Sequence, residues 1–158
     1  MRMILQRVTS ARVRVEDTVI ASIERGILLL VAIEKLDTAE EVEKAAKKIA
    51  KLRIFADPSG KMNLDIVQAQ GSCLVVSQFT LAASLKRGRR PSFDNAAAPV
   101  QAETLVRLLG DRLESQGVPV ERGRFGAMME VELVNDGPVT FVLDSLVPGT
   151  EAASGGEP

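Results

Sequence analysis

The sequence predicts one α+β domain, with a largely antiparallel sheet or part-barrel and two main helices. Short apolar runs typical of strands recur between residues 3 and 143, and short turns join most of them. Two longer segments, beginning near Thr38 and Pro99, repeat apolar residues at helical spacing. The length of 158 residues suits a single core. We expect a folded domain over residues 1–146 and a disordered tail over residues 147–158, where small, Gly-rich and acidic residues replace the apolar pattern.

The composition excludes several classes of protein. Hydrophobic residues make up 46% and charged residues 26% of the chain, as in ordinary soluble globular proteins. The 20 basic and 21 acidic residues nearly cancel, so only a local patch could hold a nucleic acid, and we expect no DNA partner. Cys73 is the one cysteine and there is no histidine. This excludes a disulfide framework, zinc sites built on His or Cys clusters, and Ser-His or Cys-His catalytic pairs.

The sequence also carries no targeting or cofactor signal. The first seven residues are too short and too polar for a signal peptide, and no apolar run reaches membrane-spanning length. We therefore expect a cytoplasmic protein without membrane contact. Asp57, Asp65, Asp94 and Asp136 stand singly in predicted loops. No spacing among them is typical of a metal site, so we assign neither a metal nor a cofactor.

The first strands are predicted from residues 3–8 and 11–15, which alternate apolar and polar residues. A turn is predicted at residues 16–18, which are Glu, Asp and Thr, and residues 19–23 would return antiparallel. The continuous apolar run over residues 27–33 is typical of a strand buried on both faces.

The first helix is predicted to begin after Thr38, because Thr38 and Glu41 match a capping box. Its inward residues would be Val42, Ala45, Ala46, Ile49 and Leu52. On the other face, the glutamate and lysine pairs one turn apart are Glu40 with Lys44 and Glu43 with Lys47. This pattern favours a solvated helix face over a binding site.

The second half repeats this alternation of strands and a helix. Residues 57–60 form a turn, a loop or short strand follows, and Gly71 opens a buried strand in which Cys73 acts as a small hydrophobe. Pro99 opens the second helix and Gly117 ends it. Its inward residues would be Ala102, Leu105, Val106, Leu109 and Leu113. The last strands are predicted over residues 128–134 and 139–143.

A polar stretch, Ser-Gln-Phe-Thr-Leu at residues 77–81, continues the buried strand. Strand alternation would place Ser77, Phe79 and Leu81 on one side and Gln78 and Thr80 on the other. Polar groups at this point are either satisfied structural groups or a site at the strand end. Without a histidine base, Thr80 is a weak candidate for an activated nucleophile. The backbone N–H groups of Phe79 and Thr80 could instead stabilise a developing oxyanion.

A second polar stretch, Asn-Asp-Gly-Pro-Val-Thr at residues 135–140, separates the last two predicted strands. Taken alone, Asp136 and Gly137 favour a hairpin turn. Pro138 complicates that reading, because proline cannot donate to a sheet ladder and permits a cis peptide bond. The Gly-Pro step could therefore display two backbone carbonyls to a ligand.

The densest basic cluster comprises Lys86, Arg87, Arg89 and Arg90, on a loop predicted from Gly88 and Pro91. Its charges suit phosphates, with no pattern for reading bases. A solubilising surface loop is an equally good interpretation.

Together these stretches resemble the D-aminoacyl-tRNA deacylase family. The two polar motifs carry the resemblance, with supporting blocks at residues 6–8, 53–55, 60–63, 90–93 and 123–125. It covers about residues 1–145 in order. Either motif alone would be weak, but both in register with the supporting blocks are highly specific. The tail after Ser145 is a departure that affects nothing catalytic.

The resemblance implies a homodimer that hydrolyses the ester joining a D-amino acid to the 3′-terminal ribose of tRNA, and that clears glycine mischarged on tRNA. It implies a cis bond between Gly137 and Pro138, whose carbonyls would enter the partner subunit's pocket. The residues that would line this pocket are Ser77, Gln78, Phe79 and Thr80. Two parallel carbonyls can hold the α-amino group and the Cα–H, which leaves no room for an L side chain.

The remaining roles also follow from the resemblance. Arg7 would brace the Gly-Pro carbonyls, and Phe125 and Met129 would form apolar walls for the terminal adenosine and ribose. The basic loop would meet tRNA phosphates. Hydrolysis would be assisted by the RNA's own 2′-hydroxyl, with Thr80 as covalent nucleophile the alternative.

Two other functions fit the same residues. One is a deacylase of the same fold with a different amino-acid specificity, for which the Gly-Pro bond would be trans. The other is a non-catalytic RNA-binding or dimerisation module, which would bind RNA without releasing an amino acid.

Overall fold

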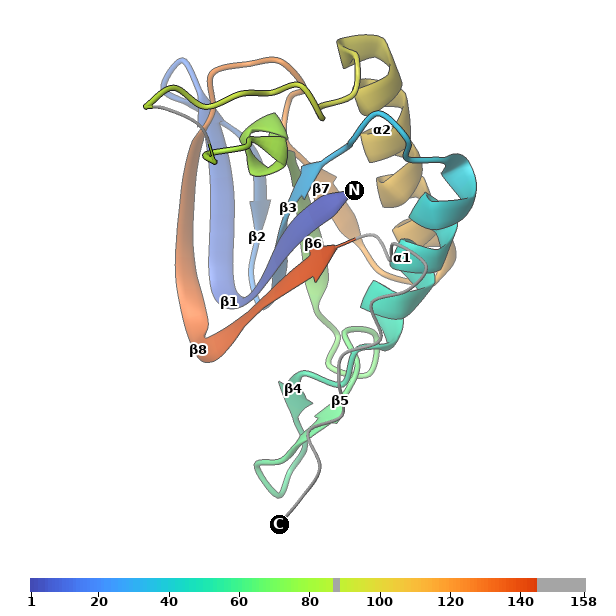
Figure 1. Cartoon of the computed structure of the whole chain (residues 1–158). Coiled ribbons are helices and arrows are strands. Elements are labelled where there is room, and N and C mark those ends of the chain that lie inside the picture. Colours follow the sequence, from blue (N-terminus) through green and yellow to red (C-terminus); the bar gives the residue numbers. More distant parts are fainter. Residues whose placement is uncertain (87–88, 145–158) are drawn as a thin grey trace.

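The computed structural model describes residues 1–86 and 89–144, and it shows a six-stranded sheet with two helices on one side (Figure 1). The elements in chain order are β1 (Arg2–Val15), β2 (Thr18–Ile23), β3 (Gly26–Ala32), α1 (Ala39–Lys51), β4 (Phe55–Ala56), β5 (Met62–Leu64), β6 (Ser72–Ser77), the 3-10 helix η1 (Phe79–Ala82), α2 (Pro99–Ser115), β7 (Val120–Arg122) and β8 (Glu130–Asp144). The strand order is β2-β1-β3-β6-β7, and β8 pairs with β1. The predicted α+β class with a part-barrel sheet is confirmed.

The sheet is mixed. In the described part of the chain β1 pairs antiparallel with β2, β3 and β8, whereas β3–β6 and β6–β7 are parallel. The parallel pairs arise because α1 and α2 carry the chain back across the sheet between successive strands. The prediction of a largely antiparallel sheet therefore holds for the N-terminal part and misses the two parallel pairs.

Two apolar clusters fill the two sides of the curled sheet. The larger one packs β1, β3 and β6 against the helices through residues such as Leu29, Ile49 and Leu109. The smaller one lies inside the curl and includes Val8, Leu28 and Leu74. The predicted burial of the third strand on both faces is confirmed, because its alternate residues enter different clusters.

Local signals located the helices correctly. Thr38 caps α1, and its side chain and that of Glu41 form the predicted capping box. Pro99 is at the start of α2, and Gly117 follows its end with a φ of 85°. The predicted ion pairs on the outer face of α1 are also present, Lys44–Glu40 and Lys47–Glu43.

Two strands are longer than predicted. The two segments near the N-terminus form one strand, β1, and residues 128–134 and 139–143 belong to one strand, β8. Both strands bend in the middle (Figure 1). The hairpin turn predicted at residues 135–138 is therefore wrong, because both halves of β8 pair with the same strand in one direction.

The strand that contains Cys73 ends earlier than predicted. β6 stops at Ser77, and Phe79 begins η1, so strand alternation does not continue through residues 77–81. Residues 87–88 and 145–158 lie outside the described part, and the predictions for Arg87 and for the tail fall there. None of the helices in residues 1–86 and 89–144 is long and apolar enough to cross a membrane.

Candidate functional site

The first motif forms the junction between β6 and η1. Ser77 is the half-buried last residue of β6, and the Gln78 backbone N–H donates to the Val31 carbonyl at 2.7 Å, which fixes the junction to β3. The Gln78 side-chain amide donates to the Thr80 hydroxyl at 2.6 Å. Phe79 and Thr80 occupy the first turn of η1, where helical geometry leaves N–H groups without intrahelical acceptors. These two N–H groups are therefore available to a negatively charged oxygen.

An apolar pocket of about 300 Å³ opens beside this junction. Its wall is formed by Val31, Ile33, Ser77, Phe79, Ala96, Ala97, Pro99, Ala102, Val106, Phe125 and Gly126. Phe125 is half-buried in the wall, and its contact with the adenosine stays a prediction. Met129 packs against the cluster inside the curled sheet. Its predicted place beside the adenosine therefore has no support from this pocket.

The second motif lies in a bulge of β8. Gln6 pairs with Thr140 and Val8 pairs with Asn135, so Arg7 alone faces four residues, 136–139. The Gly137–Pro138 bond is cis, as the resemblance implies, and both residues are exposed. The bulge moves this dipeptide out of the hydrogen-bond ladder between the strands. Within the ladder, Pro138 would leave one hydrogen bond unmade because it has no backbone N–H.

Arg7 and Asn135 hold the bulge in place. The Arg7 Nε donates to the Asp136 carbonyl at 3.0 Å and lies 2.9 Å from the Asp136 carboxylate. Its Nη1 donates to the Ile54 carbonyl at 2.5 Å. The Asn135 amide donates to the Arg7 carbonyl at 2.8 Å and to the Val139 carbonyl at 3.4 Å. Arg7 thus braces the residue before Gly137, one position away from the carbonyls named in the prediction.

The two motifs do not meet within one chain. The dipeptide Gly137–Pro138 lies on β8, and Ser77 ends β6, with β1 and β3 between these strands. The prediction that they meet across two subunits stays a prediction. The exposed apolar side chains of β8 are Leu133, Val134, Phe141 and Val142.

The basic loop begins and ends at a backbone bridge. Ser84 N–H donates to the Ser92 carbonyl at 2.8 Å, and Ser92 N–H donates back at 3.0 Å. Lys86, Arg89 and Arg90 are exposed on the loop that this bridge closes. They are near η1 in sequence and remain free to meet a polyanion from solvent.

Among the described residues, three groups near the site have shifted pKa values, and each shift has a clear physical cause. Arg122, beside a smaller hollow that also contacts Ser77 and Phe125, binds Glu114 and Asp111 on α2. Its hydrogen bond holds the pKa of Glu114 below the usual value, and Glu114 raises the pKa of Arg122. Burial raises the pKa of the Cys73 thiol to about 12, so it stays protonated, in agreement with its prediction as a buried hydrophobe.

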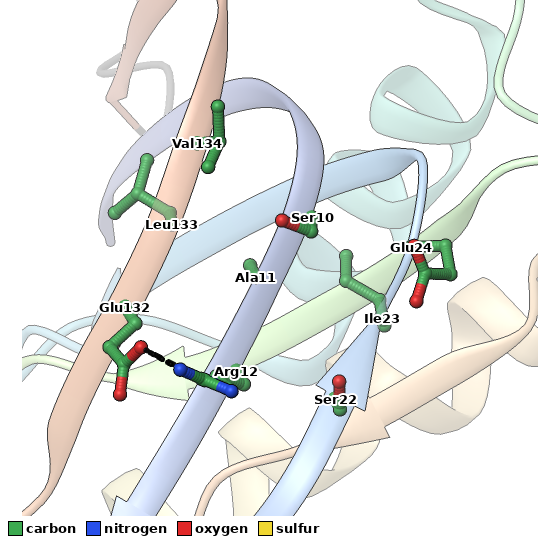
Figure 2. A pocket seen from close by; sticks show the side chains of 9 residues that line it. All are labelled: Ser10, Ala11, Arg12, Ser22, Ile23, Glu24, Glu132, Leu133 and Val134. Atoms are coloured by element: carbon green, nitrogen blue, oxygen red, sulfur yellow. Dashed lines mark hydrogen bonds and ion pairs between the residues drawn. The ribbon is translucent and has the colours of Figure 1, made fainter.

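A larger hollow, of about 420 Å³, lies elsewhere on the sheet (Figure 2). It crosses β2, β1 and β8, and Figure 2 shows the ion pair of Arg12 with Glu132 on one side. The hydrogen bond from Arg12 lowers the pKa of Glu132. This hollow contains no residue of either motif. We therefore place the candidate site at the smaller apolar pocket, because a sequence motif, two free N–H groups and an apolar wall converge there.

Sequence reasoning missed several features in and beside the site. Phe93 packs on Phe79 with ring centroids 5.0 Å apart, although its sequence block was recognised without a role. The pocket wall from residues 96–106 comes from the segment around the start of α2 and carries no polar signal. Asn135 belongs to the second motif, but the hydrogen bonds of its side-chain amide depend on the bulge.

The comparisons with known proteins agree over the whole described fold. Residues 4–144 match the family model described as D-Tyr-tRNA(Tyr) deacylase. A protein of Thermomicrobium roseum named D-aminoacyl-tRNA deacylase is 53% identical over 145 residues, which cover 92% of this chain and 94% of that protein. One of Brevibacillus brevis with the same name is 50% identical over 145 residues, covering 92% of this chain and 100% of that protein.

Solved structures give the same fold. A structure named c-Myc DNA Unwinding Element Binding Protein superposes with a TM-score of 0.86 at 39% identity, covering 92% of this chain and 99% of that chain. A second, described as a probable eukaryotic D-amino acid tRNA deacylase, has a TM-score of 0.78 at 18% identity and covers 90% and 97%.

The fold and the family match together define a hydrolase of the aminoacyl-tRNA deacylase class. The chain belongs to the D-Tyr-tRNA(Tyr) deacylase family. The prediction of this family from the two motifs is confirmed.

Proposed function

We propose that this enzyme hydrolyses the ester between a D-amino acid and the 3′-terminal ribose of tRNA, and that it also clears glycine mischarged on tRNA. The observation that carries the proposal is the junction of β6 and η1, where two first-turn N–H groups adjoin an apolar pocket of about 300 Å³. The pocket suits an adenosine, and the N–H groups suit the ester oxygen as it becomes negative. The reaction belongs to translation quality control in the cytoplasm.

The chirality filter would be made of main chain. Gly137 and Pro138 are exposed in the β8 bulge, and Arg7 and Asn135 hold that bulge from both sides. In a homodimer, the dipeptide of one subunit would enter the pocket of the other and exclude an L side chain by its backbone. The strand order supports this arrangement, because β1 and β3 separate the two motifs within one chain.

The chemistry would come mainly from the substrate. The chain contains no histidine, and the Thr80 hydroxyl accepts its hydrogen bond from an amide, which is no base. Hydrolysis could instead be assisted by the 2′-hydroxyl of the terminal ribose, while backbone N–H groups stabilise the oxyanion. This mechanism requires no side chain as base or nucleophile. In the alternative, Thr80 attacks the ester carbonyl itself. A Thr80→Ala variant that retains turnover would exclude the alternative, and one without any turnover would exclude RNA-assisted hydrolysis.

The activity is tested by release of tyrosine from D-tyrosyl-tRNA and L-tyrosyl-tRNA under identical conditions. We expect release from the D substrate alone. Binding of both charged tRNAs without release from either would indicate a non-catalytic RNA-binding module, and preference for another amino acid would indicate an editing enzyme of different specificity.

The two-subunit site is tested by mixing two inactive variants. Ser77→Phe fills the pocket, and Gly137→Val displaces the bulge, because a Cβ at Gly137 would lie 2.5 Å from the Asn135 side-chain oxygen. A mixed dimer would hold one site with both defects and one with neither. Activity should therefore return on mixing, and its failure to return between folded variants would contradict a shared site.

A further inference from the structure

An exposed aromatic pair lies at the edge of the apolar pocket. The chain has only five phenylalanines and no tyrosine or tryptophan. Phe79 and Phe93 pack on each other with ring centroids 5.0 Å apart and planes inclined by 56°. Despite this contact, Phe79 is 59% exposed and Phe93 is 39% exposed. A packed core does not need such a pair, so a ligand is the better explanation.

The structure holds Phe93 at this position through its neighbours. The Ser84–Ser92 backbone bridge ends immediately before Phe93, and the Phe93 carbonyl accepts a hydrogen bond from Ala96 N–H at 2.9 Å. Ala96 is part of the pocket wall, as is Phe79. The aromatic pair is therefore continuous with the pocket, and a molecule that fills the pocket can extend directly onto it.

The surroundings of the pair are positively charged on one side. Lys86, Arg89 and Arg90 are exposed on the loop closed by the Ser84–Ser92 bridge. Asp94, which follows Phe93 in the sequence, accepts a hydrogen bond from the Ser92 hydroxyl at 2.7 Å. A ligand that crosses the pair thus needs a flat apolar part for the rings and a negative group for the loop. An unpaired nucleotide has both.

We propose that Phe79 and Phe93 stack the base of the nucleotide that precedes the terminal adenosine, with the basic loop close to its phosphate. This inference rests on the proposed function, in which the pocket takes the adenosine. Stacking on aromatic side chains is a general mode for unpaired RNA ends and tolerates any base. This stacking would increase the affinity for an aminoacyl-tRNA, but not for a free aminoacyl nucleoside, which lacks the preceding nucleotide.

The test compares two substrates that differ only in the preceding nucleotides. D-tyrosyl-tRNA and D-tyrosyl-adenosine are given to Phe93→Leu, which keeps an apolar side chain but removes the ring, and to Phe93→Trp, which keeps an aromatic face. For Phe93→Leu we expect kcat/KM on the tRNA to fall on the order of 10-fold, mainly through KM, with no change on D-tyrosyl-adenosine. Phe93→Trp should keep the activity on both. Val19→Ala on β2, where the side chain is 43% exposed, is the matched surface control.

A direct readout uses tRNA with 2-aminopurine at the penultimate position and D-tyrosine joined by a stable amide. Binding to the unaltered protein or to Phe93→Trp should quench the 2-aminopurine fluorescence. With a saturating concentration of Phe93→Leu, this quenching should be lost. Equal losses on both substrates, or quenching that survives Phe93→Leu, would overturn the proposal. Dissociation of a dimer by Phe93→Leu would also overturn it and assign the pair to a contact between copies. If the unaltered protein cleaves neither substrate, the proposed function itself fails.

Discussion

Arg7 is the side chain on which the geometry of the β8 bulge most depends, and Arg7→Met tests this directly. Methionine keeps the apolar stem and removes the guanidinium, whose Nε and Nη1 donate to the carbonyls of Asp136 and Ile54. The Arg7 side chain is only 12% exposed, whereas that of Asp136 is 39% exposed. We therefore count the two carbonyl bonds, at the lower end of their usual contribution, and the ion pair hardly at all.

Each hydrogen bond from a charged donor contributes about 1.5–3 kcal/mol, and the two together give a loss of about 3 kcal/mol after partial solvation of the bulge. For a domain of this size that loss lowers Tm by about 6–12 °C. Because the bulge carries Gly137, kcat/KM for D-tyrosyl-tRNA should fall about 10- to 100-fold beyond any loss of folded protein. Thermal unfolding gives the change in Tm. Single-turnover deacylation, measured at a temperature below the lower of the two Tm values, gives the change in kcat/KM.

Arg12→Met is the matched control on the same pair of strands. Arg12 and Glu132 form an ion pair whose side chains are 46% and 45% exposed, so its loss should cost less than about 1 kcal/mol and leave deacylation unchanged. If Arg7→Met behaves like Arg12→Met in both assays, the reasoning that Arg7 holds the bulge is refuted.

Three further predictions concern the core and its edges. Asp37→Ala should destabilise the protein by about 3 kcal/mol in denaturant unfolding, because the carboxylate is buried against the Met1 α-ammonium; a loss below 1 kcal/mol would contradict this. Gly26→Ala should lower Tm by several degrees or prevent folding, since a Cβ there would lie 1.8 Å from the Ser72 carbonyl oxygen; an unchanged Tm would show that β3 and β6 can separate at no cost. Cys73 should resist iodoacetamide at pH 9 in the folded protein, where an exposed thiol would be half ionised, because burial raises its pKa to about 12; rapid alkylation seen by mass spectrometry without denaturant would exclude that burial.

The helices could be predicted because their signals are local. The Thr38 and Glu41 side chains satisfy backbone groups within one turn, and Pro99 fits the first helical position by its own φ angle. No distant contact is needed to recognise either helix start.

The course of β8 could not be predicted from its own residues. Asp136 and Gly137 favour a turn, but pairing with β1 on both sides of Arg7 keeps the chain extended and confines the irregularity to a bulge. The Asn135 amide supplies hydrogen bonds to two carbonyls where Pro138 has no N–H. Tertiary pairing thus overrides local turn chemistry.

The pocket wall shows a similar limit. Ile33, Ala97 and Phe125 come from three distant segments and are ordinary apolar residues in the sequence. The polar motif at residues 77–81 identified the junction, whereas the shape of the adjoining pocket depends on how α2 and its preceding loop pack on β3. The family resemblance predicted the activity, and the fold shows which side chains line the pocket beside the first motif.

The chirality of the substrate is the central claim, and the most direct test is the ratio of kcat/KM values for D-tyrosyl-tRNA and L-tyrosyl-tRNA with the unaltered enzyme. A main-chain filter that leaves no room for an L side chain predicts a ratio above about 1,000, which corresponds to about 4 kcal/mol of discrimination. Equal rates for the two substrates, or faster release from the L substrate, would contradict the account.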